Sequence, residues 1–93
     1  IVQFIRFSSE LEEESILKTA MERVSNFEAL PGLLQKYYVR SADGEKFGGL
    51  YVWDSEESML AFRESELAST IASSYKVIGA PEVDIFRVLH TLR

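Results

Sequence analysis

The sequence predicts an α+β fold of the ferredoxin-like type: a four-stranded antiparallel sheet with two helices on one face, in the order βαββαβ. Three observations predict it. Apolar, β-prone segments alternate with two segments whose apolar residues recur at three- and four-residue intervals. Asp43-Gly44, a hairpin-turn signal, separates the two central apolar segments. The 93 residues accommodate these elements with short connections, so we expect a single domain, residues 1–93.

The first strand is predicted over residues 1–8, which are apolar and β-prone with two polar interruptions. Because the chain begins at Ile1 rather than at a methionine, we expect a few residues to be missing before it. Ser9 and Glu12 have the spacing of a capping box and precede an acidic first helical turn. This first helix ends just before Pro31-Gly32. Its predicted buried stripe consists of Leu17, Ala20, Met21, Val24 and Phe27.

A central hairpin follows, with strands predicted over residues 33–40 and 47–53 and a turn over 41–45. Asp54 and Ser55 can cap the second helix, which has glutamates in its first turn. The apolar side of this helix is predicted to contain Met59, Leu60, Phe62, Leu67 and Ile71.

The last strand is predicted over residues 82–92, after a break at Gly79-Ala80-Pro81. Its apolar residues occupy both sides, with Val83, Ile85 and Leu89 on one and Phe86 and Val88 on the other. The strand at 33–40 is likewise apolar on both sides. Since two helices cover only one face of the sheet, we expect a second subunit to cover the other.

Composition excludes several classes of function. The chain carries 15 Asp+Glu against 10 Lys+Arg, a formal net charge of −5, and no basic stripe, so we expect no nucleic-acid partner. No apolar run approaches the roughly 18 residues of a membrane helix, so we expect no membrane association. The absence of cysteine excludes disulfides and thiol chemistry and is compatible with the cytoplasm, where we expect the protein.

The motifs of conventional cofactor sites are missing from the sequence. It contains no phosphate-cradling glycine loop, no dinucleotide fingerprint, no metal-ligand spacing and no serine-nucleophile elbow. We therefore expect no metal and no bound cofactor. Catalysis, if the protein has any, must work without a tightly bound conventional cofactor or borrow one.

Two segments carry a resemblance to a known family. Pro-Gly-Leu-Leu-Gln-Lys at 31–36 and Gly-Gly-Leu-Tyr-Val-Trp at 48–53, ahead of a helix with Ala61-Phe62, resemble the YdhR-like mono-oxygenases. These form a branch of the dimeric α/β-barrel superfamily, related to the antibiotic-biosynthesis monooxygenases. The resemblance implies a homodimer whose two sheets pack into a barrel, with a small pocket in each subunit between sheet and helices. It also implies oxidation of phenolic, polycyclic aromatic substrates by molecular oxygen, without flavin, haem or metal.

Candidate ligand contacts lie on the second and third strands. Gly49, Tyr51 and Trp53 share one side, where a glycine permits close approach and an aromatic pair can stack on a flat ligand. A strand bend at the glycine and core packing of the aromatics are the structural alternatives. Gln35, at a position where the family often carries tryptophan, shares a side with Tyr37. Sequence alone does not fix whether that side also carries Tyr51, and the resemblance implies that it does.

Three further residues have chemistry that their positions do not explain. His90 is the only histidine and the only side chain whose ordinary pKa lies near neutral pH; the alternatives are catalysis and a plain surface position. Arg6 and Arg87 interrupt apolar strands, and an inward-facing charge must be paired or bind an anion. The alternative to binding an anion is pairing with Asp84 or with a helix glutamate across a dimer contact.

The leading hypothesis is a cofactor-independent mono-oxygenase that binds a small phenolic or polycyclic aromatic substrate between sheet and helices. A polar side chain would hydrogen-bond or deprotonate the substrate, whose anion would react directly with oxygen. The catalytic candidates are Tyr51, His90 and Gln35, and the substrate-binding candidates are Tyr37, Trp53, Gly49 and Arg87. The alternative is a non-enzymatic dimeric domain, ligand-binding or stress-associated, that uses the same pocket only for sequestration.

Overall fold

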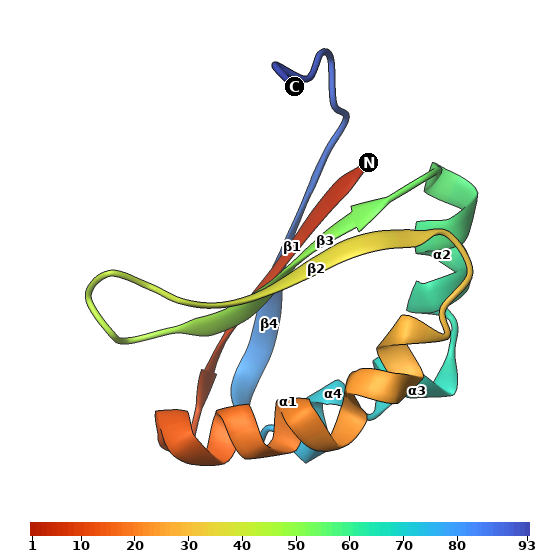
Figure 1. Ribbon diagram of the computed structural model, residues 1–93. Coiled ribbons are helices and arrows are strands. Elements are labelled where there is room, and N and C mark those ends of the chain that lie inside the picture. Colours follow the sequence, from red (N-terminus) through yellow and green to blue (C-terminus); the bar gives the residue numbers. More distant parts are fainter.

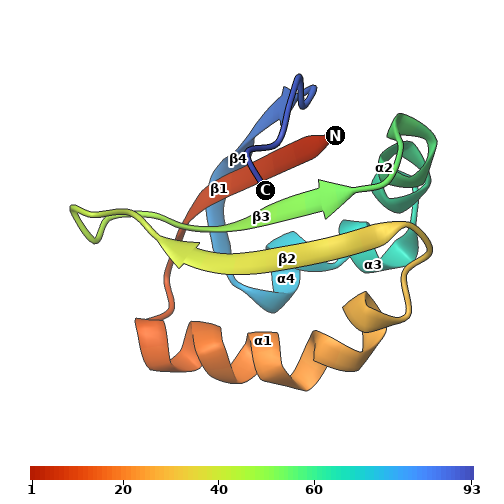
Figure 2. The ribbon, with the colours of Figure 1, turned by 45° about the horizontal axis from the view of Figure 1, so that its top comes forward.

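The predicted ferredoxin-like architecture is confirmed by the computed structural model, which describes residues 1–93. Four antiparallel strands form one sheet in the order β2-β3-β1-β4, and the helices pack against one face of it (Figures 1 and 2). The elements are β1 (Val2–Ser9), α1 (Glu13–Glu28), β2 (Leu33–Arg40), β3 (Phe47–Trp53), α2 (Glu56–Arg63), α3 (Glu66–Ser69), α4 (Ile71–Ser74) and β4 (Val77–Phe86). None of the helices combines the length and the apolar composition that a membrane span requires.

The strand register decides which side chains face the helices. Gln3 pairs with Tyr51, and Tyr51 pairs with Lys36, so these three project from the same face of the sheet and toward the helices. Their sequence neighbours project from the opposite side, which we call the open face. The open face comprises Val2, Phe4, Arg6, Gln35, Tyr37, Val39, Gly48, Leu50, Val52, Glu82, Asp84 and Phe86.

The core lies between the sheet and the helices. Aromatic rings from three elements meet there: the Phe62 ring lies 5.4 Å from those of Tyr51 and Trp53, and the Phe27 ring lies 6.2 Å from that of Tyr51. These contacts hold α1 and α2 against the same face of the sheet. The buried apolar residues are Ile5, Phe7, Ile16, Ala20, Phe27, Phe47, Tyr51, Trp53, Met59, Phe62, Ile71 and Tyr75.

Helix α1 ends where predicted, but it begins later than predicted, at Glu13, and its buried stripe is rotated. Ile16, Ala20 and Phe27 are buried, whereas Leu17 is 46% and Met21 is 60% exposed, so the prediction for those two was wrong. Both stripes satisfy helical periodicity, and only contact with the sheet selects between them. The capping box is also wrong. Glu12 is the N-cap residue, and the Ser9 hydroxyl instead accepts a bond from the Leu11 amide at 2.9 Å.

The second predicted helix is divided into three short ones. Ser55 caps α2 as predicted, its hydroxyl accepting from the Ser58 amide at 3.2 Å. Ser65 then starts α3 in the same way, accepting from the Ala68 amide at 3.2 Å. Because a serine hydroxyl competes for backbone groups, each such residue favours a new helix start over continuation.

Strand β4 begins and ends earlier than predicted. It runs through Gly79-Ala80-Pro81 as a bulge, because Arg6 pairs with Glu82 while Ser8 pairs with Ile78. A positive φ of 70° at Gly79 and an edge position for the proline make the bulge tolerable. Val2 pairs with Phe86, so residues 87–93 have no partner in β1 and extend beyond the sheet (Figure 1).

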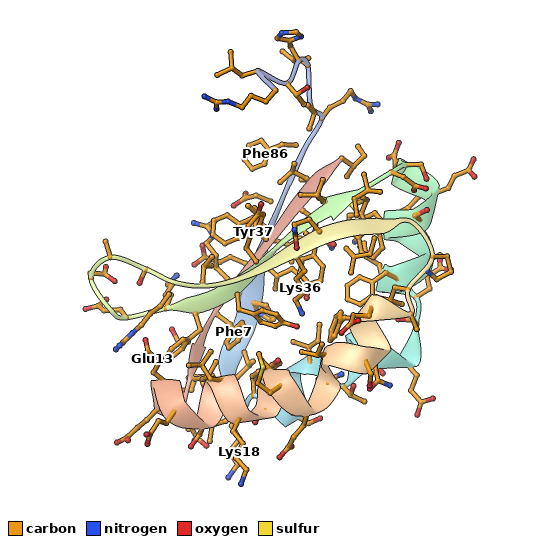
Figure 3. All side chains as sticks on the ribbon, viewed as in Figure 1. Phe7, Glu13, Lys18, Lys36, Tyr37 and Phe86 are labelled. Carbon is orange, nitrogen blue, oxygen red and sulfur yellow. The ribbon has the colours of Figure 1, made fainter.

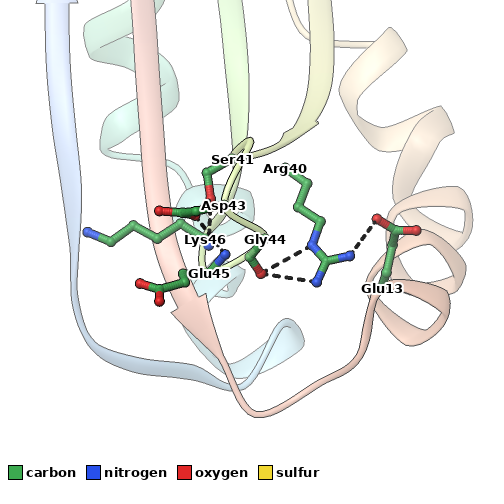
Figure 4. A network of polar contacts seen from close by, with 7 residues as sticks. All are labelled: Glu13, Arg40, Ser41, Asp43, Gly44, Glu45 and Lys46. Atoms are coloured by element: carbon green, nitrogen blue, oxygen red, sulfur yellow. Dashed lines mark hydrogen bonds and ion pairs between the residues drawn. The ribbon is translucent and has the colours of Figure 1, made fainter.

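The β2–β3 hairpin is fastened to the start of α1 (Figure 4). Within the turn, Asp43 accepts bonds from the Ser41 hydroxyl at 2.6 Å and the Glu45 amide at 2.9 Å, and these bonds lower the pKa of the Asp43 carboxyl. Arg40 donates to the Gly44 carbonyl at 3.0 Å and reaches Glu13 of α1 at 3.3 Å. The hairpin therefore closes over one end of the interlayer space.

Candidate functional site

A cavity of about 280 Å³ lies between the sheet and α1. Gly49 has no side chain to fill it, and Arg40 and Glu13 line its end at the hairpin. The walls are mainly apolar and aromatic, as in small-molecule sites. They include Phe7, Phe47 and Tyr51 from the sheet, Ala20 from α1, and Ile71 and Tyr75 from the segment around α4.

Lys36 is the one lysine that lines this cavity. Its side chain points from β2 into the space between sheet and α1 (Figure 3). The Nζ atom lies 3.4 Å from the ring centroid of Phe27, 4.4 Å from that of Tyr38 and 4.7 Å from that of Tyr51. Such ring faces attract a cation, and they surround the amine on several sides.

The amine of Lys36 is nevertheless poised to lose its charge. Burial, assisted by the nearby positive charge of Arg23, lowers the pKa of Lys36 from 10.5 to about 7. The ring faces partly offset the loss of hydration, so the ammonium and the free amine are both accessible near neutral pH. A free lysine amine in a cavity can act as a base.

Three tyrosines present hydroxyl groups to the same region. Burial is the main cause that raises the pKa of Tyr38, Tyr51 and Tyr75, so all three are protonated donors at neutral pH. The Tyr75 side chain is 5% exposed, and its buried Oη has no hydrogen-bond partner. A base and uncommitted O–H donors at one apolar cavity can take a proton from a ligand and stabilise the resulting oxyanion.

The structure brings two of the predicted site residues to this cavity. Tyr51 and Gly49 line it. Trp53 is buried beside Tyr51, with their rings parallel and 6.1 Å apart, but it does not line the cavity. Its Nε1 donates to Gln3 Oε1 at 3.0 Å, so its polar group is already satisfied within the core.

Gln35 and Tyr37 lie on the open face, so the expectation that they share a face with Tyr51 is wrong. The cause is one extra residue in β2. Leu33 pairs with Trp53, but Gln35 pairs with Val52, which leaves Leu34 as a bulge. Without it Gln35 would pair with Tyr51, and a shift of one residue moves every following side chain to the other face. Figure 3 shows Tyr37 and Lys36 on opposite sides of the sheet.

The remaining candidates also lie away from the cavity. His90 belongs to the exposed segment that follows β4. The Arg87 side chain is 75% exposed, with Nη2 4.0 Å from a Glu56 carboxylate oxygen. Arg6 is paired with Asp84, which was the alternative to anion binding. It also forms an ion pair with Glu82 at 3.3 Å.

Sequence reasoning missed Lys36, Tyr38 and Tyr75. Lys36 carried a usable signal, because it is the single charge within the apolar run 33–39, the same irregularity that drew attention to Arg6. Tyr75 carried none, since its place beside the cavity depends on how α3 and α4 turn the chain back.

Fold and cavity define a class: ferredoxin-like α+β proteins with a cavity between sheet and helices. The family model described as "Putative mono-oxygenase ydhR" matches residues 2–92, and the chain belongs to this mono-oxygenase family. No curated protein matches the chain.

Several solved structures share the fold. Rv0793 from Mycobacterium tuberculosis has a TM-score of 0.78 at 14% identity and covers 99% of this chain and 97% of its own. SnoaB, described as a cofactor-independent oxygenase from Streptomyces nogalater, has a TM-score of 0.75 at 17% identity, covering 98% and 95%. A protein described as a putative antibiotic biosynthesis monooxygenase from Nitrosomonas europaea has a TM-score of 0.75 at 15% identity, covering 96% and 98%. At these identities the likeness shows the fold alone.

Proposed function

We propose that this protein is a cofactor-independent mono-oxygenase acting on a small aromatic hydroxyl compound bound between the sheet and α1. The observation that carries the proposal is the aromatic cavity that holds a lysine of lowered pKa together with protonated tyrosines. Membership of the mono-oxygenase family and the fold shared with SnoaB, described as a cofactor-independent oxygenase, support it.

The size of the cavity narrows the substrate class. A cavity of roughly 150 Å³ holds one benzene ring. The present cavity, at about 280 Å³, is nearly twice that size. It therefore suits one ring with substituents or two fused rings, and larger polycyclic compounds require movement at the hairpin end.

The reaction needs no external reductant. A phenol that loses its hydroxyl proton becomes an electron-rich anion, and oxygen forms a bond to a ring carbon that carries hydrogen. Loss of that hydrogen and cleavage of the O–O bond give a quinone and one water. The phenol supplies the electrons that reduce the second oxygen atom. The protein contributes by binding the anion in a dry cavity and by placing donors beside it.

Tyr51 is proposed as a hydrogen-bond donor to the substrate oxygen rather than as a base, because burial raises the pKa of its hydroxyl. Gly49 is proposed as the floor against which a flat ring lies. The cavity wall does not include Gln35, Tyr37, Trp53, Arg87 or His90, and we assign them no contact with the substrate.

We propose that the protein is a homodimer in which the second copy covers the open face of the sheet. The open face carries exposed apolar side chains, among them Tyr37 at 52% and Phe86 at 57% exposure, and no helix of this chain packs over it. Face-to-face packing of two sheets would bury them. The exposed apolar segment after β4 would add further contacts.

Oxygen consumption tests the proposal. Purified protein is mixed with 1-naphthol or a substituted phenol in an oxygen electrode, with chelator present and no added flavin. We expect one oxygen molecule consumed per quinone formed, with one atom of labelled oxygen in the product and one in water. The non-enzymatic alternative predicts binding of the same compounds without oxygen uptake above the protein-free rate.

A further inference from the structure

Two cations, Lys36 in the cavity wall and Arg23 near it, have no carboxylate partner. The five ion pairs of the structure involve neither Lys36 nor Arg23. Arg23 of α1 donates from Nη2 to the Leu67 carbonyl at 3.0 Å and the Thr70 hydroxyl at 2.7 Å, and its buried Nη1 has no partner. In a chain with a net charge of −5, this is a local excess of positive charge.

The groups that face Lys36 from the elements packed around it are one cation and three neutral tyrosines. Arg23 comes from α1, Tyr38 from β2 itself and Tyr51 from β3, while Tyr75 reaches the cavity from the end of α4. Two carboxylates lie in the neighbourhood. Glu13 lines the far end of the cavity, where it pairs with Arg40, and Glu28 raises the pKa of Tyr38.

We propose that the cavity binds an aromatic hydroxyl compound as its oxyanion, with Lys36 Nζ taking the hydroxyl proton and Tyr75 Oη donating a hydrogen bond to the oxygen. This assignment rests on the proposed function, because it takes the same cavity as the substrate site. The step is a proton transfer that needs no further reactant. The ligand O–H bond breaks, an N–H bond forms on the amine, and an ammonium–phenolate pair results with no change in oxidation state.

Geometry supports this arrangement over a purely structural lysine. A lysine that only packs its stem on the core directs its ammonium into water. Lys36 instead points toward α1 and places Nζ over the Phe27 ring. Tyr75 lines the same cavity, and its buried Oη has no hydrogen-bond partner. A buried hydroxyl without a partner destabilises the fold, and a ligand oxyanion that accepted its hydrogen bond would remove this penalty.

The test uses 4-nitrophenol, whose neutral and anionic forms absorb at different wavelengths, and 4-nitroanisole, which has no ionisable proton. Both are titrated into the wild-type protein at about pH 7, where a large part of the free nitrophenol is neutral and part of the Lys36 amine is unprotonated and able to take its proton. The variants are Lys36→Met, Tyr75→Phe and the matched control Lys18→Met, whose lysine lies on the exposed side of α1 (Figure 3).

Wild-type and Lys18→Met proteins should bind nitrophenol with the spectrum of its anion. Lys36→Met should bind it about tenfold or more weakly and in the neutral form, because the charge-assisted contact is lost. Tyr75→Phe should bind it a few-fold more weakly while keeping the anion spectrum. Nitroanisole should bind equally to all four proteins.

A neutral spectrum for nitrophenol bound to the wild-type protein would overturn the assignment of Lys36 and leave the cavity as an aromatic site. This outcome needs no variant, so it holds even if Lys36→Met does not fold. An anion spectrum without oxygen uptake on any phenol would support the assignment and overturn the proposed turnover. Failure of both probes to bind would overturn both proposals.

Discussion

At the scale of single residues, the clearest structural pair is Gln3 with Trp53. Gln3 is 1% exposed, and its Oε1 accepts the only hydrogen bond that the Trp53 indole makes. Each side chain therefore supplies the hydrogen-bond partner that the other needs in order to be buried. This assigns Trp53 to the core, the alternative that sequence reasoning had weighed against stacking on a ligand.

Replacing Trp53 with Phe should lower the free energy of unfolding by about 2–4 kcal/mol, since it leaves a cavity and an unpaired buried amide. Adding Gln3→Met should recover about 1 kcal/mol, because the amide is removed as well. Urea unfolding of both single variants and the double variant measures this coupling. Nitroanisole affinity should stay unchanged, and a loss of affinity as large as the loss of stability would place Trp53 at the ligand.

Lys36 should destabilise the fold at low pH. Its pKa is about 7 in the folded chain and 10.5 in the unfolded reference. Between these values the unfolded state binds more protons, so stability rises with pH. Below pH 7 both states carry the charge and the cost of burying it is fully present.

Lys36→Met should therefore raise the free energy of unfolding at pH 6 by about 2 kcal/mol. The advantage over wild type should shrink as pH rises toward 10. Urea unfolding at several pH values, with Lys18→Met as the control, measures the difference. A difference that is independent of pH would mean that the Lys36 ammonium remains hydrated.

At the scale of elements, the sequence predicted the order and nature of the strands well, because alternation and turn signals are local. It predicted the second strand within 33–40 but not the face that each of its residues occupies. That face depends on the bulge at Leu34, which only the pairing of Leu33 with Trp53 and Gln35 with Val52 reveals. The site was missed for the same reason: the sequence analysis expected Gln35 to face the cavity, whereas Lys36, the next residue, does so.

Two adjacent glycines of β3 should respond differently to alanine. A Cβ at Gly48 would lie 2.4 Å from the Ile5 carbonyl oxygen, which belongs to the backbone of the neighbouring strand. A Cβ at Gly49 would meet Tyr51 Cε1 at 2.9 Å and Lys36 Cε at 3.3 Å, which are side-chain atoms able to move.

Gly48→Ala should thus cost about 3 kcal/mol of stability or more, because the strands must separate. Gly49→Ala should cost about 1 kcal/mol but weaken nitrophenol binding about tenfold by displacing Tyr51 and Lys36. Thermal unfolding and the spectral titration separate the two effects. Unchanged binding in a folded Gly49→Ala protein would show that this glycine is needed only by the strand.

At the scale of the whole molecule, the two faces of the sheet are covered unequally. The helices cover one face except along β4, where Val83 and Ile85 are 48% and 43% exposed, whereas no helix packs over the apolar residues of the open face. Arg6 bridges Glu82 and Asp84 on that face and leaves no isolated charge there. The open face is thus chemically suited to meet a second copy of itself.

Contact between two open faces should make the protein a dimer in solution. Sedimentation at micromolar concentration should give twice the monomer mass of 10.6 kDa. Leu50→Glu places a charge at the centre of the open face, so it should shift the protein to monomer while leaving its helical circular dichroism intact. Met21→Glu is the matched control, because Met21 is 60% exposed on α1, away from that face. It should remain dimeric. A wild-type monomer, or a dimer that Met21→Glu dissociates and Leu50→Glu does not, would place the contact elsewhere and leave the open face to another partner.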